Sequence, residues 1–167
     1  MRAGQRVLGV SLLVFVAAAM AASAKDDADP LAKGTKWTGK LTQKGKIEGT
    51  ESPLSLEVTL TITRRDGTEF KADLYEKGAE TTGVELTYLV TGTVVPANEG
   101  KEYTVKFQSF DVKDAKSRVF LNIPYSGTIT RKTLKGTWKH PDNVVGTTIE
   151  GDFTLELKRE PGSPNRD

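Results

Sequence analysis

The sequence lacks cysteine altogether and has a single histidine, His140, among its 167 residues. Without cysteine the chain has no disulfide framework, no thiol nucleophile and no N-terminal cysteine that could carry a lipid. With one histidine, the usual zinc clusters and serine–histidine–aspartate triads are nearly excluded. We therefore assign no catalytic residue, no metal ligand and no cofactor, and we expect a protein that is not an enzyme.

A long apolar run is missing from residue 25 onward, so the mature chain holds no membrane-spanning helix, which needs about 20 apolar residues. The one apolar stretch, residues 7–20, follows two arginines and precedes the small residues Ala22-Ser23-Ala24. That order is typical of a secretory signal peptide, so we expect cleavage after residue 24 and a secreted or periplasmic protein. An uncleaved anchor is the alternative, but residues 7–20 are too short to span a membrane well.

A net charge is also missing from the expected mature chain. Removing the 24 residues of the signal peptide from the 167 leaves 143, and two of the 24 lysines and arginines are lost with them. The 22 basic side chains that remain balance the 22 aspartates and glutamates. This balance gives no electrostatic basis for binding nucleic acid.

What the sequence does contain is a strict alternation of apolar and polar residues, which is typical of strands with one buried face. The clearest run, residues 54–62, has leucine, valine or isoleucine at every second position. A phase change near Gln108 and Ser109 predicts a bulge there. The same period of two predicts further strands at residues 35–42, 70–75, 84–94, 102–110, 118–125, 125–131, 134–140 and 147–158.

Consecutive strands joined by short turns predict an all-β fold. We expect a single antiparallel up-and-down β-barrel of about eight strands, with a β-sandwich as the alternative. Residues 34–160 are expected to form this one domain. Residues 25–33 are expected to be a flexible N-terminal segment, and residues 161–167 a disordered tail.

The apolar faces also predict the register of two hairpins, since register is fixed by keeping those faces together. A three-residue loop that ends at Gly67 would pair Ile62 with Phe70. A turn at residues 132–133 would place Tyr125 opposite His140 and Gly127 opposite Trp138. The indole would then shield the bare backbone of that glycine.

Three segments of the sequence resemble segments of one protein family. The first predicted strand begins Gly34-Thr35-Lys36-Trp37-Thr38-Gly39, and the last strands carry Leu134-Lys135-Gly136-Thr137-Trp138 and Gly151-Asp152-Phe153-Thr154-Leu155. A glycine and a tryptophan on the first strand of an eight-stranded meander resemble the calycins, the lipocalin and avidin-like barrels. The resemblance implies that Trp37 plugs one end of a barrel and that Lys158 or Arg159 covers it. The lipocalin disulfide and the polar biotin contacts of avidin are absent, so the resemblance implies no biotin binding.

The candidate ligand-binding residues are Tyr125, Trp138 and His140. They share one face of their hairpin, and if that face points inward they line a barrel mouth with apolar walls and polar tips. The alternative is that Trp138 only packs the core and His140 only ends a strand. Small inward residues favour a cavity and large ones favour a filled core. The small ones are Gly39, Ala72, Gly127, Gly136 and Gly151, and the large ones are Phe70, Tyr88, Phe107 and Phe153.

We therefore expect an exported binding protein for a small apolar or amphipathic ligand. The alternative is an envelope interaction or structural protein that acts through its outer surface and has a filled core. Tyr75, Leu89 and Phe120 fall off the inward phase of their strands and are candidates for an apolar partner patch. Carboxylates such as Glu150 and Asp152 fall on the outward phase, so we assign no glycosidase pair.

Overall fold

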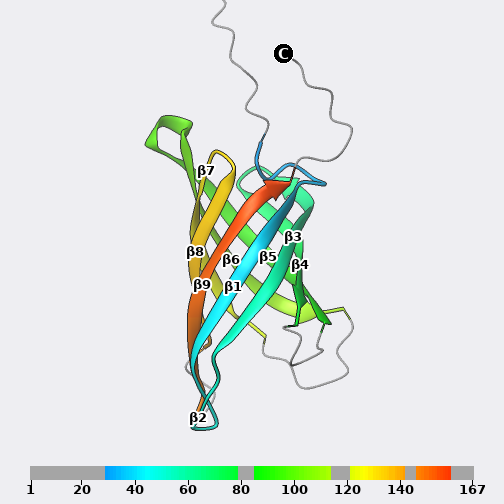
Figure 1. Cartoon of the computed structure of the whole chain (residues 1–167). Coiled ribbons are helices and arrows are strands. Elements are labelled where there is room, and N and C mark those ends of the chain that lie inside the picture. The colour runs from blue at the N-terminus through cyan, green and yellow to red at the C-terminus, as the bar shows by residue number, and fades with distance from the viewer. Residues whose placement is uncertain (1–28, 79–84, 114–120, 142–145, 159–167) are drawn as a thin grey trace, which may run out of the picture.

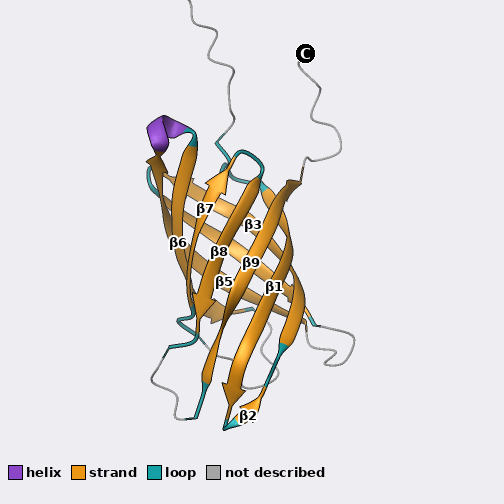
Figure 2. Ribbon diagram, turned by 60° about the vertical axis from the view of Figure 1, so that its left-hand side comes forward, coloured by secondary structure: helices purple, strands orange, loops and turns teal. Residues whose placement is uncertain are grey.

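The computed structural model describes residues 29–78, 85–113, 121–141 and 146–158. Neighbouring strands pair antiparallel in chain order, and the first strand also pairs with the last, which closes the sheet into a barrel (Figures 1 and 2). This closure confirms the predicted barrel and excludes the sandwich. The strands are β1 (Lys36–Ile47), β2 (Thr50–Glu51), β3 (Leu54–Asp66), β4 (Glu69–Lys77), β5 (Glu85–Ala97), β6 (Glu102–Val112), β7 (Pro124–Thr130), β8 (Thr133–Lys139) and β9 (Thr148–Lys158).

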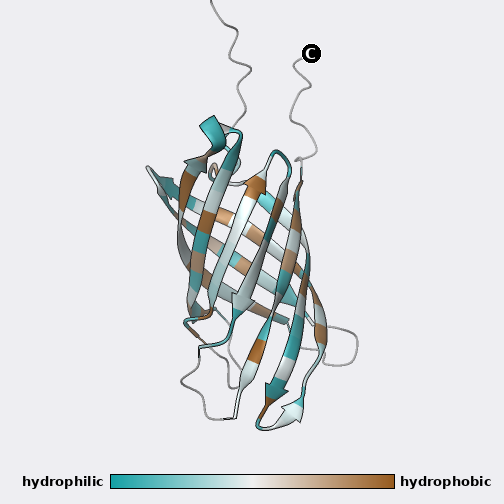
Figure 3. Ribbon diagram, turned by 90° about the vertical axis from the view of Figure 1, so that its left-hand side faces the viewer, coloured by the Kyte–Doolittle hydropathy of each residue, from teal (hydrophilic) through white to brown (hydrophobic). Residues whose placement is uncertain are grey.

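Eight of these strands form the barrel wall, and the two-residue β2 only extends the end of β1. The alternation seen in the sequence places every second side chain of the strands inside the barrel, and most of these are apolar. Figure 3 colours the ribbon by hydropathy, and brown and teal residues alternate along several strands. The described residues contain one helical element, the short 3-10 turn at Asn98–Gly100. No described helix is long and apolar enough to cross a membrane.

The predicted register of the first hairpin is wrong. The turn residues are Gly67 and Thr68, Asp66 pairs with Glu69, and the pairing shifts between Ile62 and Arg64. This turn alone would place Ile62 opposite Asp73, and the bulge brings it opposite Ala72 instead, not opposite the predicted Phe70. A bulge adds one residue to one strand, so a two-residue turn can still bring both apolar faces together.

The predicted register of the hairpin formed by β7 and β8 is also wrong. The observed pairing is shifted by two residues. The turn falls at Arg131 and Lys132, where Arg131 has a φ of 54°. Tyr125 therefore pairs with Trp138 rather than with His140, and Gly127 pairs with Gly136. A shift of two residues keeps every side chain on its own face, so the inward positions are those expected.

The expected bulge in β6 is present. Leu89 pairs with Asp111 and Val90 with Ser109, so Phe110 is the extra residue, close to the predicted position. In the described part of the strand expected at residues 118–125, residues 121–123 lie outside any strand, and only residues 124 and 125 are in a strand, β7. Residues 118–120 lie outside the described part of the chain.

One end of the barrel, called the upper end here, is closed by the segment that precedes β1. Leu31 and Trp37 are both fully buried, and the indole Nε1 of Trp37 donates a hydrogen bond of 3.0 Å to the carbonyl oxygen of Pro30. The Arg65 guanidinium lies 3.0 Å from the Asp29 carboxylate and ties this segment to β3. Both ends of the described chain lie here (Figure 1). In the described part of the segment expected to be flexible, Pro30 and Leu31 are buried, whereas Asp29 and Lys33 are exposed.

The residues expected to cover Trp37 do not do so where they are described. Lys158 is exposed on the outward phase of β9, next to Leu157, which pairs with Trp37. Leu31 and Pro30 are the buried residues beside the indole instead. Arg159, the other candidate, and the signal peptide lie outside the described residues.

Candidate functional site

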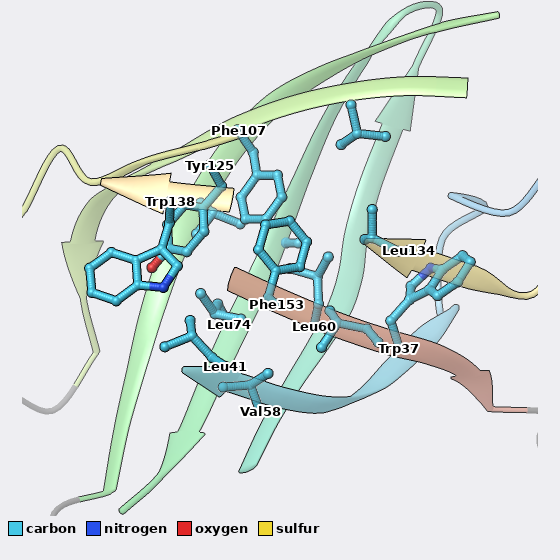
Figure 4. Packing of buried hydrophobic residues seen from close by; sticks show 14 of the residues in the cluster. Trp37, Leu41, Val58, Leu60, Leu74, Phe107, Tyr125, Leu134, Trp138 and Phe153 are labelled. Carbon is cyan, nitrogen blue, oxygen red and sulfur yellow. The ribbon is translucent and has the colours of Figure 1, made fainter. Parts of the chain in front are cut away.

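An aromatic cluster fills the middle of the barrel. Phe107, Tyr125 and Trp138 come from β6, β7 and β8, where the register places them side by side. The Phe107 and Tyr125 rings stack with centroids 4.6 Å apart and an interplanar angle of 4°, and the Tyr125 and Trp138 centroids are 6.4 Å apart. Phe153 meets the Phe107 and Tyr125 rings edge-on at 5.9 and 6.1 Å (Figure 4). Such offset and edge-on contacts stabilise a core beyond simple burial.

Three of the four glycines that were expected to leave space, Gly127, Gly136 and Gly151, are instead covered by these rings, whereas Gly39 packs against the backbone of β9. A Cβ atom on Gly136 would lie 2.5 Å from Cζ of Phe153, and one on Gly151 would lie 2.7 Å from Nε1 of Trp138. The predicted shielding of a glycine by Trp138 therefore occurs, but at Gly151 of β9 rather than at Gly127. The indole also donates a 2.9 Å hydrogen bond to the Thr42 carbonyl oxygen. This part of the interior is filled by side chains.

The three residues proposed from the sequence as a ligand site all lie inside the barrel. Tyr125, Trp138 and His140 are 4%, 5% and 3% exposed. Tyr125 and Trp138 are in one cluster, whereas His140 follows β8 toward the lower end, the end opposite the Trp37 plug. The His140 backbone N–H donates to the Ile149 carbonyl oxygen at 2.8 Å, and its Nδ1 lies 2.9 Å from the Pro141 carbonyl oxygen.

A carboxyl group that the sequence analysis missed lies near these residues. Glu76 continues the inward phase of β4 after Phe70, Ala72 and Leu74, and is half-buried. Burial raises the pKa of Glu76 to about 7. The signal was present in the sequence, because the alternation of β4 runs unbroken to this position.

Two tyrosines share the inner surface with Glu76, and Tyr88 is its diagonal neighbour because Tyr88 pairs with Leu74 and Glu76 pairs with Leu86. Tyr88 on β5 and Tyr125 on β7 are buried, and burial raises the pKa of both hydroxyls. The negative charge of Glu76 adds to the rise in each pKa, so all three groups lie within electrostatic reach of one another inside the barrel. The polar groups thus gather toward the lower end, whereas the upper end is closed by Trp37 and Leu31.

The lower rim of the barrel is apolar and only half-buried. Glu76 pairs with Leu86, and Tyr88 pairs with Val112, so these side chains share the inner surface with the polar groups. Ser109 differs from these half-buried residues because it is fully buried, and its Oγ accepts a 3.1 Å hydrogen bond from the Ile123 backbone N–H. The half-buried apolar residues toward this end are Ile47, Leu54, Leu86, Val112 and Leu121.

A second feature lies on the outside of the wall. An open depression of about 780 Å³ crosses strands β4 to β9 and reaches β1. Two rows of outward side chains border it, and the backbone of the Phe107–Tyr125–Trp138 row forms its floor. The outward side chains are Lys44, Glu69, Thr91, Thr93, Lys106, Gln108, Pro124, Ser126, Thr137, Lys139, Glu150 and Asp152.

The expected apolar outer patch is formed in part. Tyr75 and Leu89 are half-buried outward residues on β4 and β5, placed diagonally because Tyr75 pairs with Thr87. Phe110, at the bulge opposite Leu89, is 42% exposed. Phe120 lies outside the described residues. Among the described residues no cluster of histidine, aspartate and glutamate could hold a metal ion.

Comparisons with known proteins gave matches among solved structures only. No family model and no curated protein matches the sequence. Among 17 matching chains of solved structures is that of EF1p2_mFAP2b bound to DFHBI, with 11% sequence identity and a TM-score of 0.46. That match covers 77% of this chain and 94% of the other.

Proposed function

We propose that the protein is a non-enzymatic binding protein that takes a small amphipathic ligand at the lower end of its barrel. The observation that carries the proposal is the inward-facing Glu76 with Tyr88 and Tyr125 beneath a half-buried apolar rim. A carboxyl group inside a barrel is costly unless it is paired, and binding sites are where such groups are retained. The position of Trp37 on the first strand supports a calycin-like barrel with one closed and one open end.

The proposal assigns roles to the residues of the lower end. The apolar rim and the Tyr125 and Trp138 rings would contact the body of the ligand, and the polar groups would orient its head, as in other small-molecule sites. The signal peptide expected from the sequence at residues 1–24 favours an exported carrier or sensor. His140 lies at the same end and would border the ligand.

The test compares two substitutions on β5, one that obstructs the lower end of the barrel and one on the outer face of the same strand. Leu86→Trp places an indole on the inner surface beside Glu76, whereas Thr87→Trp places it on the outer face. Calorimetric titration with apolar and amphipathic compounds should show binding to the wild type and Thr87→Trp, and at least a tenfold loss for Leu86→Trp. Melting curves show whether each variant folds. Equal affinities in folded Leu86→Trp and the wild type would place any ligand elsewhere.

A second candidate is a partner bound on the outer face, and the depression across β4 to β9 favours it. Its border of threonine, serine and lysine side chains could hydrogen-bond a polar partner in the envelope. Ser126→Arg would obstruct this depression without changing the interior, because Ser126 is exposed next to the buried Tyr125. Loss of cross-linking to envelope components in Ser126→Arg, with unchanged binding of small compounds, would support this candidate.

A further inference from the structure

We propose that the upper end of the barrel is a docking site for a short segment of another protein in which aspartate, proline and leucine follow one another. The protein's own Asp29-Pro30-Leu31 occupies this site as an internal ligand. The docking site lies at the end of the barrel opposite the proposed small-molecule site, so the two sites are independent.

Each residue of the internal ligand makes a different kind of contact with the barrel. The Asp29 carboxylate lies 3.0 Å from Nε of Arg65 on β3. The Pro30 carbonyl oxygen accepts a 3.0 Å hydrogen bond from Nε1 of Trp37 on β1. The Leu31 side chain is fully buried in the hydrophobic core. A charged contact, a backbone hydrogen bond and a buried apolar anchor together are typical of sites that recognise short peptides.

The two barrel residues that donate to the internal ligand are held in place by contacts within the barrel. The Arg65 guanidinium also donates to the carbonyl oxygens of Gly67 and Glu69 at the turn between β3 and β4, and its side chain is only 21% exposed. Trp37 lies in the middle of the wall, because its strand pairs with β3 on one side and with β9 on the other. The site is therefore preorganised, which lowers the cost of binding a peptide.

The internal ligand is a turn and not a strand of the sheet. Its Asp29 carboxylate accepts a 2.9 Å hydrogen bond from the Leu31 backbone N–H, and the Asp29 carbonyl oxygen accepts one of 3.0 Å from the Ala32 N–H. Gly34, with a φ of 91°, links this turn to β1. Because these two hydrogen bonds lie within the turn, a separate peptide of the same sequence can adopt the same shape.

The internal ligand competes with any external one. A segment on a short tether acts at an effective concentration of roughly millimolar, so an external peptide binds weakly until the tethered segment is loosened. Leu31→Ala loosens it by removing the apolar anchor. Asp29→Asn loosens it less, because it removes the charge that faces Arg65 but keeps an oxygen for the Leu31 N–H.

The experiment measures, by fluorescence anisotropy, the binding of a dye-labelled peptide with the sequence of residues 25–33 to the full mature protein. The peptide should bind Leu31→Ala at least tenfold more tightly than the wild type, and Asp29→Asn more tightly by a smaller factor. A peptide that itself carries Leu31→Ala should bind the Leu31→Ala protein at least tenfold more weakly than the native peptide. Lys33→Ala changes an exposed residue of the same segment, so this control should bind the native peptide as the wild type does.

A second comparison tests the charged contact in the Leu31→Ala protein. Adding Arg65→Gln should weaken binding of the native peptide at least twofold, whereas Arg64→Gln, a change at the exposed neighbour, should leave it unchanged. Melting curves show which variants fold, and Asp29→Asn serves as the loosened protein if Leu31→Ala does not.

Each outcome is decisive for the docking site. Equal affinity of the native peptide for the wild type and the folded loosened variants, or no binding to any of them, would overturn it. Binding that does not change in Arg65→Gln would overturn the recognition of the aspartate. The proposed function stands in each of these cases, because small-compound binding and Leu86→Trp test the lower end separately.

Discussion

Glu76 should make the stability of the protein depend on pH, and Glu76→Gln should remove that dependence. The pKa of this carboxyl is about 7 in the folded protein, against an ordinary value of 4.5. One pKa unit corresponds to about 1.4 kcal/mol, so ionised Glu76 destabilises the fold by up to about 3 kcal/mol. Because the pKa is raised in the folded protein, this destabilisation is absent below pH 4.5. It grows as the pH rises from 4.5 to 7 and is complete above pH 7.

The measurement is urea-induced unfolding of the wild type and Glu76→Gln at several pH values from 4 to 8. The free energies of unfolding should be similar at pH 4, where both side chains are neutral. At pH 8 the variant should be more stable by up to about 3 kcal/mol, with the difference developing between pH 4.5 and 7. Histidine ordinarily titrates in this range, but the contribution of His140 is common to both proteins and largely cancels in the difference.

The control is Glu57→Gln, which makes the same change on the outer face of β3, opposite Lys77. Its free energy of unfolding should stay within about 0.5 kcal/mol of the wild type at every pH, as at ordinary surface positions. A difference between Glu76→Gln and the wild type that is constant with pH, or that favours the wild type at pH 8, would refute the placement of this carboxyl inside the barrel.

The other predictions concern the plug, the aromatic cluster and processing. Trp37→Ala should lower the free energy of unfolding by about 3–5 kcal/mol, because the indole is fully buried and bound to Pro30. A loss within about 0.5 kcal/mol in urea unfolding would contradict the plug. Gly151→Ala should cost about 1–3 kcal/mol, since its Cβ would overlap the Thr42 carbonyl oxygen, and unchanged stability would contradict this close packing. Mass spectrometry of the exported protein should show Lys25 as the first residue, and retention of residues 1–24 would contradict export by a cleaved signal peptide.

The barrel could be predicted from the sequence because the period of two is nearly unbroken and a closed wall needs only such strands in succession. The registers could not be predicted, because turn length and bulge position compensate for one another. In the first hairpin, the bulge between Ile62 and Arg64 lets a two-residue turn preserve the apolar faces. In the β7–β8 hairpin, a shift of two residues keeps the same faces inward, so hydrophobicity alone does not distinguish the two registers.

The inward placement of the three candidate residues could be predicted, whereas their role in binding stays a prediction. Tyr125, Trp138 and His140 are all inside, because their phase on the strands was correct. Glu76 was missed because a glutamate at a strand end is usually solvated, although its position in phase with Leu74 indicates an inward side chain. The rings that cover Gly136 and Gly151 come from strands whose registers the sequence did not determine, so the filling of the barrel centre could not be derived from residue sizes.

The most direct test of the central claim is a fluorescence titration of Trp138 in a Trp37→Phe background. The chain has two tryptophans, so Trp138 is then the single indole, and it lies in the cluster that also contains Tyr125. An apolar or amphipathic compound that binds the protein should change its emission saturably, and Leu86→Trp should bind the same compound at least tenfold more weakly in calorimetric titration. Trp138 emission that stays constant up to the solubility limit of every apolar and amphipathic probe would contradict a ligand site inside the barrel.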